Sequence, residues 1–144
     1  MPKFLTIAAL AGAAGLSAIA IDDVATFALT GSYSAASDEF GVNPLYLVSG
    51  LVHGLAYLAF AGVLHAHRRR VDDGSRLRRV IRLALIVVFL TLAAGMLANT
   101  AASAATGEML DGDGLYGAVA TVSFLLMFVG SIALGFSLLR RPDM

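Results

Sequence analysis

Cysteine and tryptophan are absent from the 144-residue chain, and only three prolines occur. Without cysteine the chain can form no disulfide bond, thiolate metal site, iron–sulfur cluster or cysteine nucleophile, and the three histidines remain as the usual imidazole ligands. Charge is also scarce, and ten Lys and Arg balance ten Asp and Glu, so no basic surface for nucleic acid is expected. We therefore expect no metal, no cofactor and no nucleic-acid partner.

Apolar residues dominate what is present. They make up 58% of the chain against 14% charged residues, whereas an average soluble domain is about half apolar and about a quarter charged. Four runs, at residues 4–30, 44–66, 80–105 and 115–139, reach the roughly 20 residues that a helix needs to cross a bilayer. The runs lack the two-residue alternation of a membrane β-barrel. The sequence thus predicts an all-α, integral membrane four-helix bundle, antiparallel in up-down-up-down order, formed by a single domain over residues 1–144.

The distribution of positive charge predicts an orientation in the cell membrane. The ten cations lie before the first run, around the middle loop and after the last run: Lys3, seven arginines between residues 68 and 82, Arg140 and Arg141. The loops at 32–43 and 107–114 contain acids but no Lys or Arg. Because Lys and Arg concentrate in cytoplasmic segments, we expect both termini and the basic loop at 67–79 to be cytoplasmic.

The first run also fits a signal peptide, since Lys3 precedes it and Ala18-Ile19-Ala20 matches an A-x-A cleavage site. We expect the run to be retained as a span, with cleavage as the alternative.

The two halves of the chain resemble each other weakly. Residues 23–31 align with 99–107, and Leu45-Tyr46 aligns with Leu115-Tyr116. The aligned pairs are Asp23 with Asn99, Ala25 with Ala101, Ala28 with Ala104, Thr30 with Thr106, Gly31 with Gly107, Tyr46 with Tyr116, and His53 with Ser123. A true repeat would be parallel, with its axis along the membrane normal. Chance identity between Ala-rich segments is the alternative.

Ionisable residues inside the apolar runs are the candidate site. Inserting one such side chain into the membrane costs at least about 2.5–3.5 kcal/mol on insertion scales. Ionisable residues in membrane spans therefore usually face the bundle interior. If the first helix continues to residue 30, Asp22 and Asp23 lie about 11–12 Å below its outer end, close to the depth of His53. We expect an Asp–His pair across the two helices. The alternatives are aspartates among the lipid headgroups and a His53 that only bonds a backbone carbonyl or serine.

Helical spacing does not decide which aspartate faces His53. One stripe of small residues predicts a packing seam that includes Asp22: Ala8, Gly12, Gly15, Ala18, Asp22 and Ala25. Asp23 shares its side of the helix with Thr26 and Thr30, which is typical of a polar cavity wall. The candidate catalytic residues are Asp22, Asp23 and His53. The candidate substrate-binding residues are Ser49, Tyr46, Tyr57, Thr26, Asn99 and Ser123.

Three functions fit these features. The first is a pocket that binds a small lipophilic molecule and performs metal-free acid/base chemistry of an isomerase or cyclase type. The second is a proton-coupled transporter of a small molecule or ion, which with four spans would act as a homodimer. The third is a non-catalytic accessory or scaffold subunit whose polar residues lock helices together. The sequence leaves open whether the protein is an enzyme.

Overall fold

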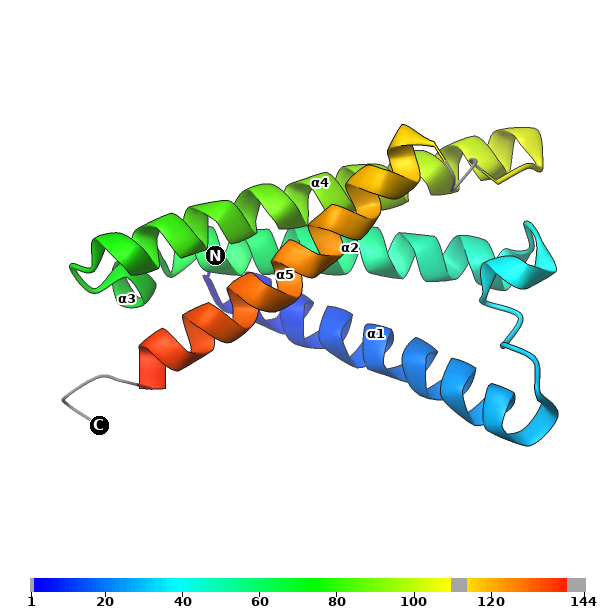
Figure 1. Ribbon diagram of the computed structural model, residues 1–144, viewed down its shortest axis with the longest axis horizontal. Helices are drawn as coiled ribbons and strands as arrows, with labels where there is room; N and C mark the ends of the chain where they lie inside the picture. The colour runs from blue at the N-terminus through cyan, green and yellow to red at the C-terminus, as the bar shows by residue number, and fades with distance from the viewer. Residues whose placement is uncertain (1, 110–113, 140–144) are drawn as a thin grey trace.

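The computed structural model describes residues 2–109 and 114–139, and every regular element in these ranges is helical. Figure 1 labels the long helices and the short helix α3. The long helices are α1 (Pro2–Thr30), α2 (Pro44–Ala66), α4 (Arg76–Thr106) and α5 (Leu115–Leu139), and the short ones are η1 (Asp38–Phe40) and α3 (Arg68–Asp72). All four long helices are long and apolar enough to cross a membrane. Arg140 and Arg141, which count toward the predicted orientation, lie outside the described residues.

The helix bounds follow local signals in the sequence. The bounds of α2 and α5 coincide with the predicted runs, and α1 continues through both aspartates to Thr30. Asn43 caps α2, because its Oδ1 accepts from the backbone N–H groups of Leu45 and Tyr46 at 2.9 and 3.0 Å.

The basic segment at 67–79 is the main departure from the prediction. It was expected as a loop, but it contains α3 and the first residues of α4, which begins at Arg76 rather than residue 80. Ser75 caps α4 by accepting from the N–H of Arg78 at 3.4 Å. A hydropathy criterion misses this turn because arginine is polar, although it is a good helix former.

Helices α2 and α4 form the central pair, with α1 packed on α2 and α5 packed on α4. Glycines allow the close approaches. A Cβ added at Gly54 of α2 would lie 2.6 Å from the Leu97 side chain of α4, and one at Gly130 of α5 would lie 2.8 Å from Leu85. A helical bundle therefore fits the arrangement, with α1 and α5 at its outside.

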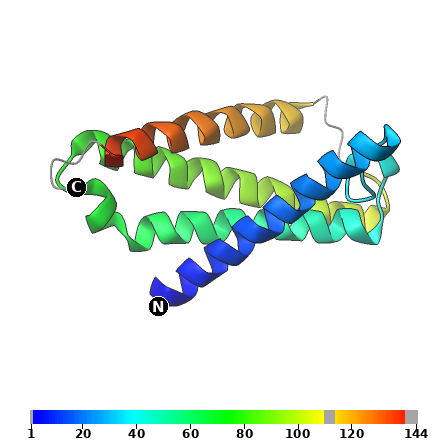
Figure 2. The same cartoon turned by 90° about the horizontal axis from the view of Figure 1, so that it is seen from below.

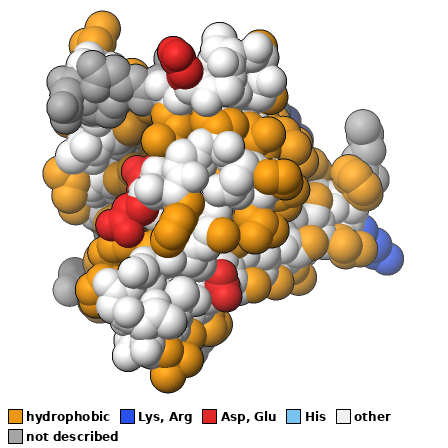
Figure 3. Space-filling model, turned by 90° about the vertical axis from the view of Figure 1, so that its right-hand side faces the viewer, with side chains coloured by type: hydrophobic (Ala, Val, Ile, Leu, Met, Phe, Trp, Pro, Cys, Tyr) orange, Lys and Arg blue, Asp and Glu red, His pale blue; other side chains and the backbone are white. Residues whose placement is uncertain are grey.

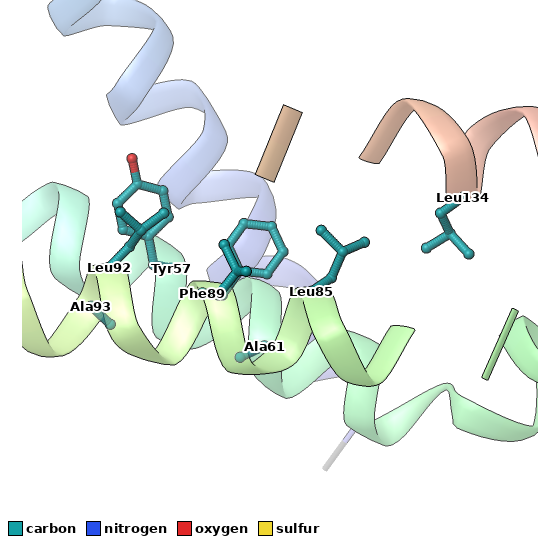
Figure 4. Packing of buried hydrophobic residues seen from close by; sticks show 8 residues of the cluster. Tyr57, Ala61, Leu85, Phe89, Leu92, Ala93 and Leu134 are labelled. Atoms are coloured by element: carbon teal, nitrogen blue, oxygen red, sulfur yellow. The ribbon is translucent and has the colours of Figure 1, made fainter. Parts of the chain in front are cut away.

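The buried core lies mainly between α2 and α4, where Figure 4 shows its side chains. Tyr57 of α2 stacks on Phe89 of α4 with ring centroids 6.1 Å apart, and Leu134 extends the cluster to α5. Tyr57, predicted as a substrate-binding residue, is only 3% exposed and belongs to this core. Large apolar side chains such as Phe4, Leu115 and Phe128 are exposed on the outer helices.

Helix α1 crosses α2 obliquely (Figures 1 and 2), and this corrects the predicted seam. Gly12 does meet α2, since an added Cβ would lie 2.7 Å from the Cβ of Ala56. Farther along, the predicted seam members are exposed: Ala18, Asp22 and Ala25. The half-buried face passes through other residues: Leu16, Ile19, Asp23 and Thr26. The predicted place of Asp22 in the seam is wrong, because a crossing helix does not keep one straight stripe in contact.

An ion pair between Arg82 and Asp72 lies at the arginine-rich end of the molecule, beside the basic segment at 67–79. Arg82, 5% exposed, donates from Nε and Nη2 to the two carboxylate oxygens of Asp72 at 2.7 and 3.0 Å. Arg78 donates to the backbone carbonyl of Ser137 at 2.8 Å, which joins the start of α4 to α5. The hydrogen bonds from Arg82, and secondarily the nearby positive charges, hold the pKa of Asp72 below its usual value.

Candidate functional site

A cavity of about 710 Å³ lies at the opposite end of the molecule, where α1 and the 31–43 loop meet α2, α4 and α5. Figure 3 looks onto this end and shows Asp and Glu side chains at several points around it. The lining, in chain order, is Asp23, Tyr33, Ala36, Ser37, Asp38, Glu39, Tyr46, Ser49, Gly50, His53, Met96, Asn99, Thr100, Met109, Tyr116 and Ala120. Five of the nine predicted site residues are among them: Asp23, Tyr46, Ser49, His53 and Asn99.

Asp23 ties the 31–43 loop to α1. Its Oδ1 accepts hydrogen bonds from the backbone N–H of Ser34, at 3.2 Å, and from the Ser34 hydroxyl. Ser34 is 4% exposed, so this contact holds the loop against the bundle. Within residues 2–109 and 114–139, no group donates to Oδ2 of Asp23, which leaves that oxygen available to a ligand.

His53 forms its hydrogen bond within α2. Its Nδ1 lies 2.8 Å from the carbonyl oxygen of Ser49, and the Ser49 hydroxyl is 3.5 Å away. A carbonyl only accepts, so Nδ1 carries the hydrogen, and in the neutral ring Nε2 is then an acceptor. Nε2 has no hydrogen-bond partner among the described residues. The imidazole is thus oriented, with one nitrogen free to exchange a proton.

The Asp–His contact expected from the sequence is not formed. Asp23 and His53 both line the cavity, but no hydrogen bond or ion pair joins them in the part of the chain that the structure describes. The two groups therefore stand at separate points of the lining, where a ligand could lie between them.

Asn99 and Tyr46 join the second half of the chain to the first across the cavity wall. The amide Nδ2 of Asn99 donates to the Tyr46 hydroxyl at 2.7 Å, and the Ser103 hydroxyl donates to Oδ1 of Asn99 at 3.4 Å. Tyr116 donates to the backbone carbonyl of Gly95 at 3.4 Å. These bonds fix the side chains that line the α4 side.

A narrow apolar crevice of about 40 Å³ lies beside the cavity, between α4 and α5. It shares Met96, Tyr116 and Ala120 with the cavity. The rest of its lining is Thr91, Leu92, Gly95, Val119 and Ser123. Ser123, a predicted substrate-binding residue, therefore lies in the crevice rather than in the cavity.

Besides Tyr57, which belongs to the core, two predicted residues lie outside both spaces. Asp22 is exposed on α1, and Thr26 is half-buried one turn beyond Asp23, where its carbonyl accepts from the Thr30 hydroxyl at 2.8 Å. The structure thus distinguishes the two aspartates, and only Asp23 borders the cavity.

Sequence reasoning missed the contribution of the 31–43 loop. Asp38 and Glu39 line the cavity because η1 folds over the end of the bundle, with Asn43 Nδ2 donating to the carbonyl of Ala35 at 2.8 Å. Tyr116 was also missed, although its alignment with Tyr46 was a usable signal.

The aligned halves contribute matched positions to the cavity. Asp23 and Asn99 both line it, as do Tyr46 and Tyr116. The helices that carry Asp23 and Asn99 also end alike: Gly31 and Gly107 both have φ of 75°, and each N–H bonds the carbonyl four residues earlier at 2.9 Å.

Comparison with known proteins finds no match to any family model, to any curated protein or to any solved structure.

Proposed function

We propose that this chain is a multi-pass protein of the cell membrane that binds a small lipophilic molecule in the cavity bordered by Asp23 and His53. The helices would cross the membrane in antiparallel succession, with both termini cytoplasmic. The contacts between neighbours support this order, because the start of α1 meets the end of α2 at Leu5 and Gly62, while Gly15 meets Val52. The cavity would then open toward the outer face, away from the arginines.

The cavity itself is the observation that carries the proposal. Its volume of about 710 Å³ is within the range of roughly 300–1,000 Å³ typical of small-molecule sites. A scaffold subunit needs closely packed helices rather than such a space. Asp23, His53 and Asn99 are polar groups on segments otherwise apolar enough to be membrane spans, where such groups are costly and usually functional.

Acid/base chemistry on the bound molecule is the catalytic form of this proposal. His53 would take a proton at Nε2, and the carboxyl group of Asp23 would give or take one at a second point of the same ligand. Two proton transfers at separated atoms suffice for an isomerisation or cyclisation. The separation of Asp23 from His53 supports this form over a direct Asp–His pair, since a ligand can occupy the space between them.

A proton-coupled transporter, acting as a homodimer, is the alternative. It needs a route from the cavity to the other end of the molecule. Tyr57, Phe89 and Leu92 belong to the packed core, which lies between the cavity and the arginine-rich end. This packing supports a pocket that ends in the core over a pathway that continues through the molecule. Proton movement into sealed vesicles on addition of substrate would instead favour the transporter.

Photolabelling tests the pocket with a defined probe, the neutral diazirine 3-azioctanol, on purified protein in phosphatidylcholine nanodiscs. We expect labelled peptides from the cavity lining, competed by excess octanol. Ala120→Phe should narrow the cavity on its α5 side and reduce this labelling, whereas Ala118→Phe, an exposed position on the same helix, should not. Equal labelling of the two variants would contradict the proposal.

A further inference from the structure

We infer that the ligand of the cavity carries a positive charge, as an organic ammonium ion with an apolar substituent. This inference rests on the proposed function, because it names the chemical class of molecule that the same pocket would take. Four features carry it: the sign of the charge around the cavity, the open oxygen of Asp23, the spacing of the carboxylates, and the apolar crevice on one side.

The charged groups of the lining have one sign. Asp23, Asp38 and Glu39 border the cavity, and its described lining contains no Lys or Arg. The nearest cation on α4 is Arg82, which precedes the lining residue Met96 by 14 residues, or about 21 Å of helix. An anionic ligand would meet uncompensated repulsion, whereas a cation would be attracted.

Asp23 has the geometry to receive the charge. Ser34 occupies only Oδ1, and Oδ2 has no donor within the described ranges. An ammonium N–H group donating to a carboxylate forms a charge-assisted hydrogen bond, which is roughly twice as strong as a neutral one. A carboxylate on a membrane-spanning helix gains more from such a partner than one in water, because the surrounding dielectric is lower.

The described carboxylates of the lining do not form a metal-binding cluster. No group of three or more His, Asp or Glu side chains in the described part of the chain is placed to hold one. Negative charge spread over a wide cavity instead matches a bulky cation. Tyr33, Tyr46 and Tyr116 also border the space, and aromatic faces attract organic cations.

The apolar crevice gives the ligand a direction. In the described lining, the first half of the chain supplies the three carboxylates and His53, whereas the second half has neutral residues at the positions aligned with Asp23 and His53, Asn99 and Ser123. The crevice adjoins the cavity on the side of the second half, where Met96 and Tyr116 line both spaces. The ammonium group would therefore lie toward α1, with its apolar substituent directed between α4 and α5.

Three six-carbon probes that differ only in the head group are compared at pH 7: hexylamine, hexanoate and hexanol. Each is titrated calorimetrically into the protein in phosphatidylcholine nanodiscs, with empty nanodiscs as the blank. We expect hexylamine to bind at least about tenfold more tightly than hexanoate, the effect of one charge-assisted hydrogen bond. Asp23→Asn should lower hexylamine affinity by about tenfold and change hexanol affinity less, since the amide oxygen can still accept from Ser34.

Asp22→Asn is the matched control, because it removes the same charge from the neighbouring, exposed position and should leave all three affinities unchanged. The double variant Asp38→Asn/Glu39→Gln, in exposed loop positions, should also weaken hexylamine binding. Equal effects of Asp22→Asn and Asp23→Asn, or hexanoate binding as tightly as hexylamine, would overturn the inference.

Ala120→Phe, which narrows the cavity, distinguishes failure of this inference from failure of the proposed function. If Ala120→Phe weakens the binding of all three probes and the head group makes no difference, the pocket stands and the cationic ligand is wrong. If Ala120→Phe weakens the binding of no probe, both proposals fall.

Discussion

Arg82 and Asp72 illustrate how one charged pair fixes the arginine-rich end. The Arg82 side chain is 6% exposed and the Asp72 side chain 14%, and Asp72 also lies 3.6 Å from Nε of Arg79. Arg82 therefore depends on Asp72 for its counter-charge, whereas Asp72 has two cations beside it. Removing one partner of such a pair leaves a charge desolvated without its counter-ion, which is more damaging than replacing both. The pair connects α3 to α4 and so places the basic segment against the bundle.

The lowered pKa of Asp72 predicts an acid-sensitive contribution to stability. The contribution is present in full above the ordinary pKa of 3.8 and is lost as pH falls through the lower pKa of the folded state. Thermal unfolding followed by circular dichroism in detergent should therefore show that Asp72→Asn lowers the midpoint at pH 7 and reduces the loss of stability below about pH 4.

Asp73→Asn is the control for this prediction. Asp73 contacts Arg78 at 3.4 Å with a side chain 53% exposed, so its replacement should change the midpoint less. If Asp73→Asn and Asp72→Asn shift the midpoint equally, the special role given to the Arg82 pair is wrong.

The contact between α1 and α2 determines how the cavity end opens. The two helices approach most closely around Gly12 and Ala56, and their oblique crossing then brings Asp23 to the cavity. Small residues are common where membrane helices pack, because they let backbones come close. A side chain added at the crossing should therefore destabilise the packing of α1 on α2, while one added away from the crossing should not.

Gly12→Ala tests this crossing against Gly135→Ala. The added Cβ at Gly12 would lie 2.9 Å from the Cα of Ala56, whereas one at Gly135 meets no atom of the described chain within 4 Å. Overpacking of this kind costs about 1–3 kcal/mol. Both glycines are inside helices, so replacement by alanine raises helix propensity equally in the two variants, and the difference between them reports the contact. Unfolding in detergent should show a loss only for Gly12→Ala, and equal stabilities would refute the close approach.

The sequence predicts the helices well and their mutual rotation poorly. Helix α2 could be located from its apolar run and from Asn43 and Pro44, which are a capping residue and a favoured first residue. Asp22 and Asp23 could not be told apart, because their exposure depends on the crossing angle of α1. The place of Asp38 in the cavity depends on the fold of the 31–43 loop, which no periodic pattern encodes.

At the scale of the whole molecule, charge and polarity are separated along the long axis. The described arginines lie at one end, and the cavity with its carboxylates lies at the other. The aligned pairs Asp23/Asn99 and Tyr46/Tyr116 place this cavity between the two halves of the chain. The third aligned pair is split, because His53 lines the cavity and Ser123 lines the crevice, so the internal repeat remains a prediction.

The proposed orientation can be tested because the chain has no cysteine of its own. Ala35→Cys and Ala66→Cys place single exposed thiols at the two ends. In intact cells a membrane-impermeant maleimide should label the first and not the second, and permeabilisation should expose both. The unaltered chain serves as the blank, and labelling of Ala66→Cys alone in intact cells would reverse the orientation.

The most direct test of the central claim is an experimental density map of the protein purified from its own membrane without added ligand. The account predicts non-protein density inside the cavity, in contact with His53 and the carboxylate of Asp23, and distinct from the lipid around the outer helices. A map in which side chains close this space, or in which Asp23 and His53 face no common cavity, would contradict it.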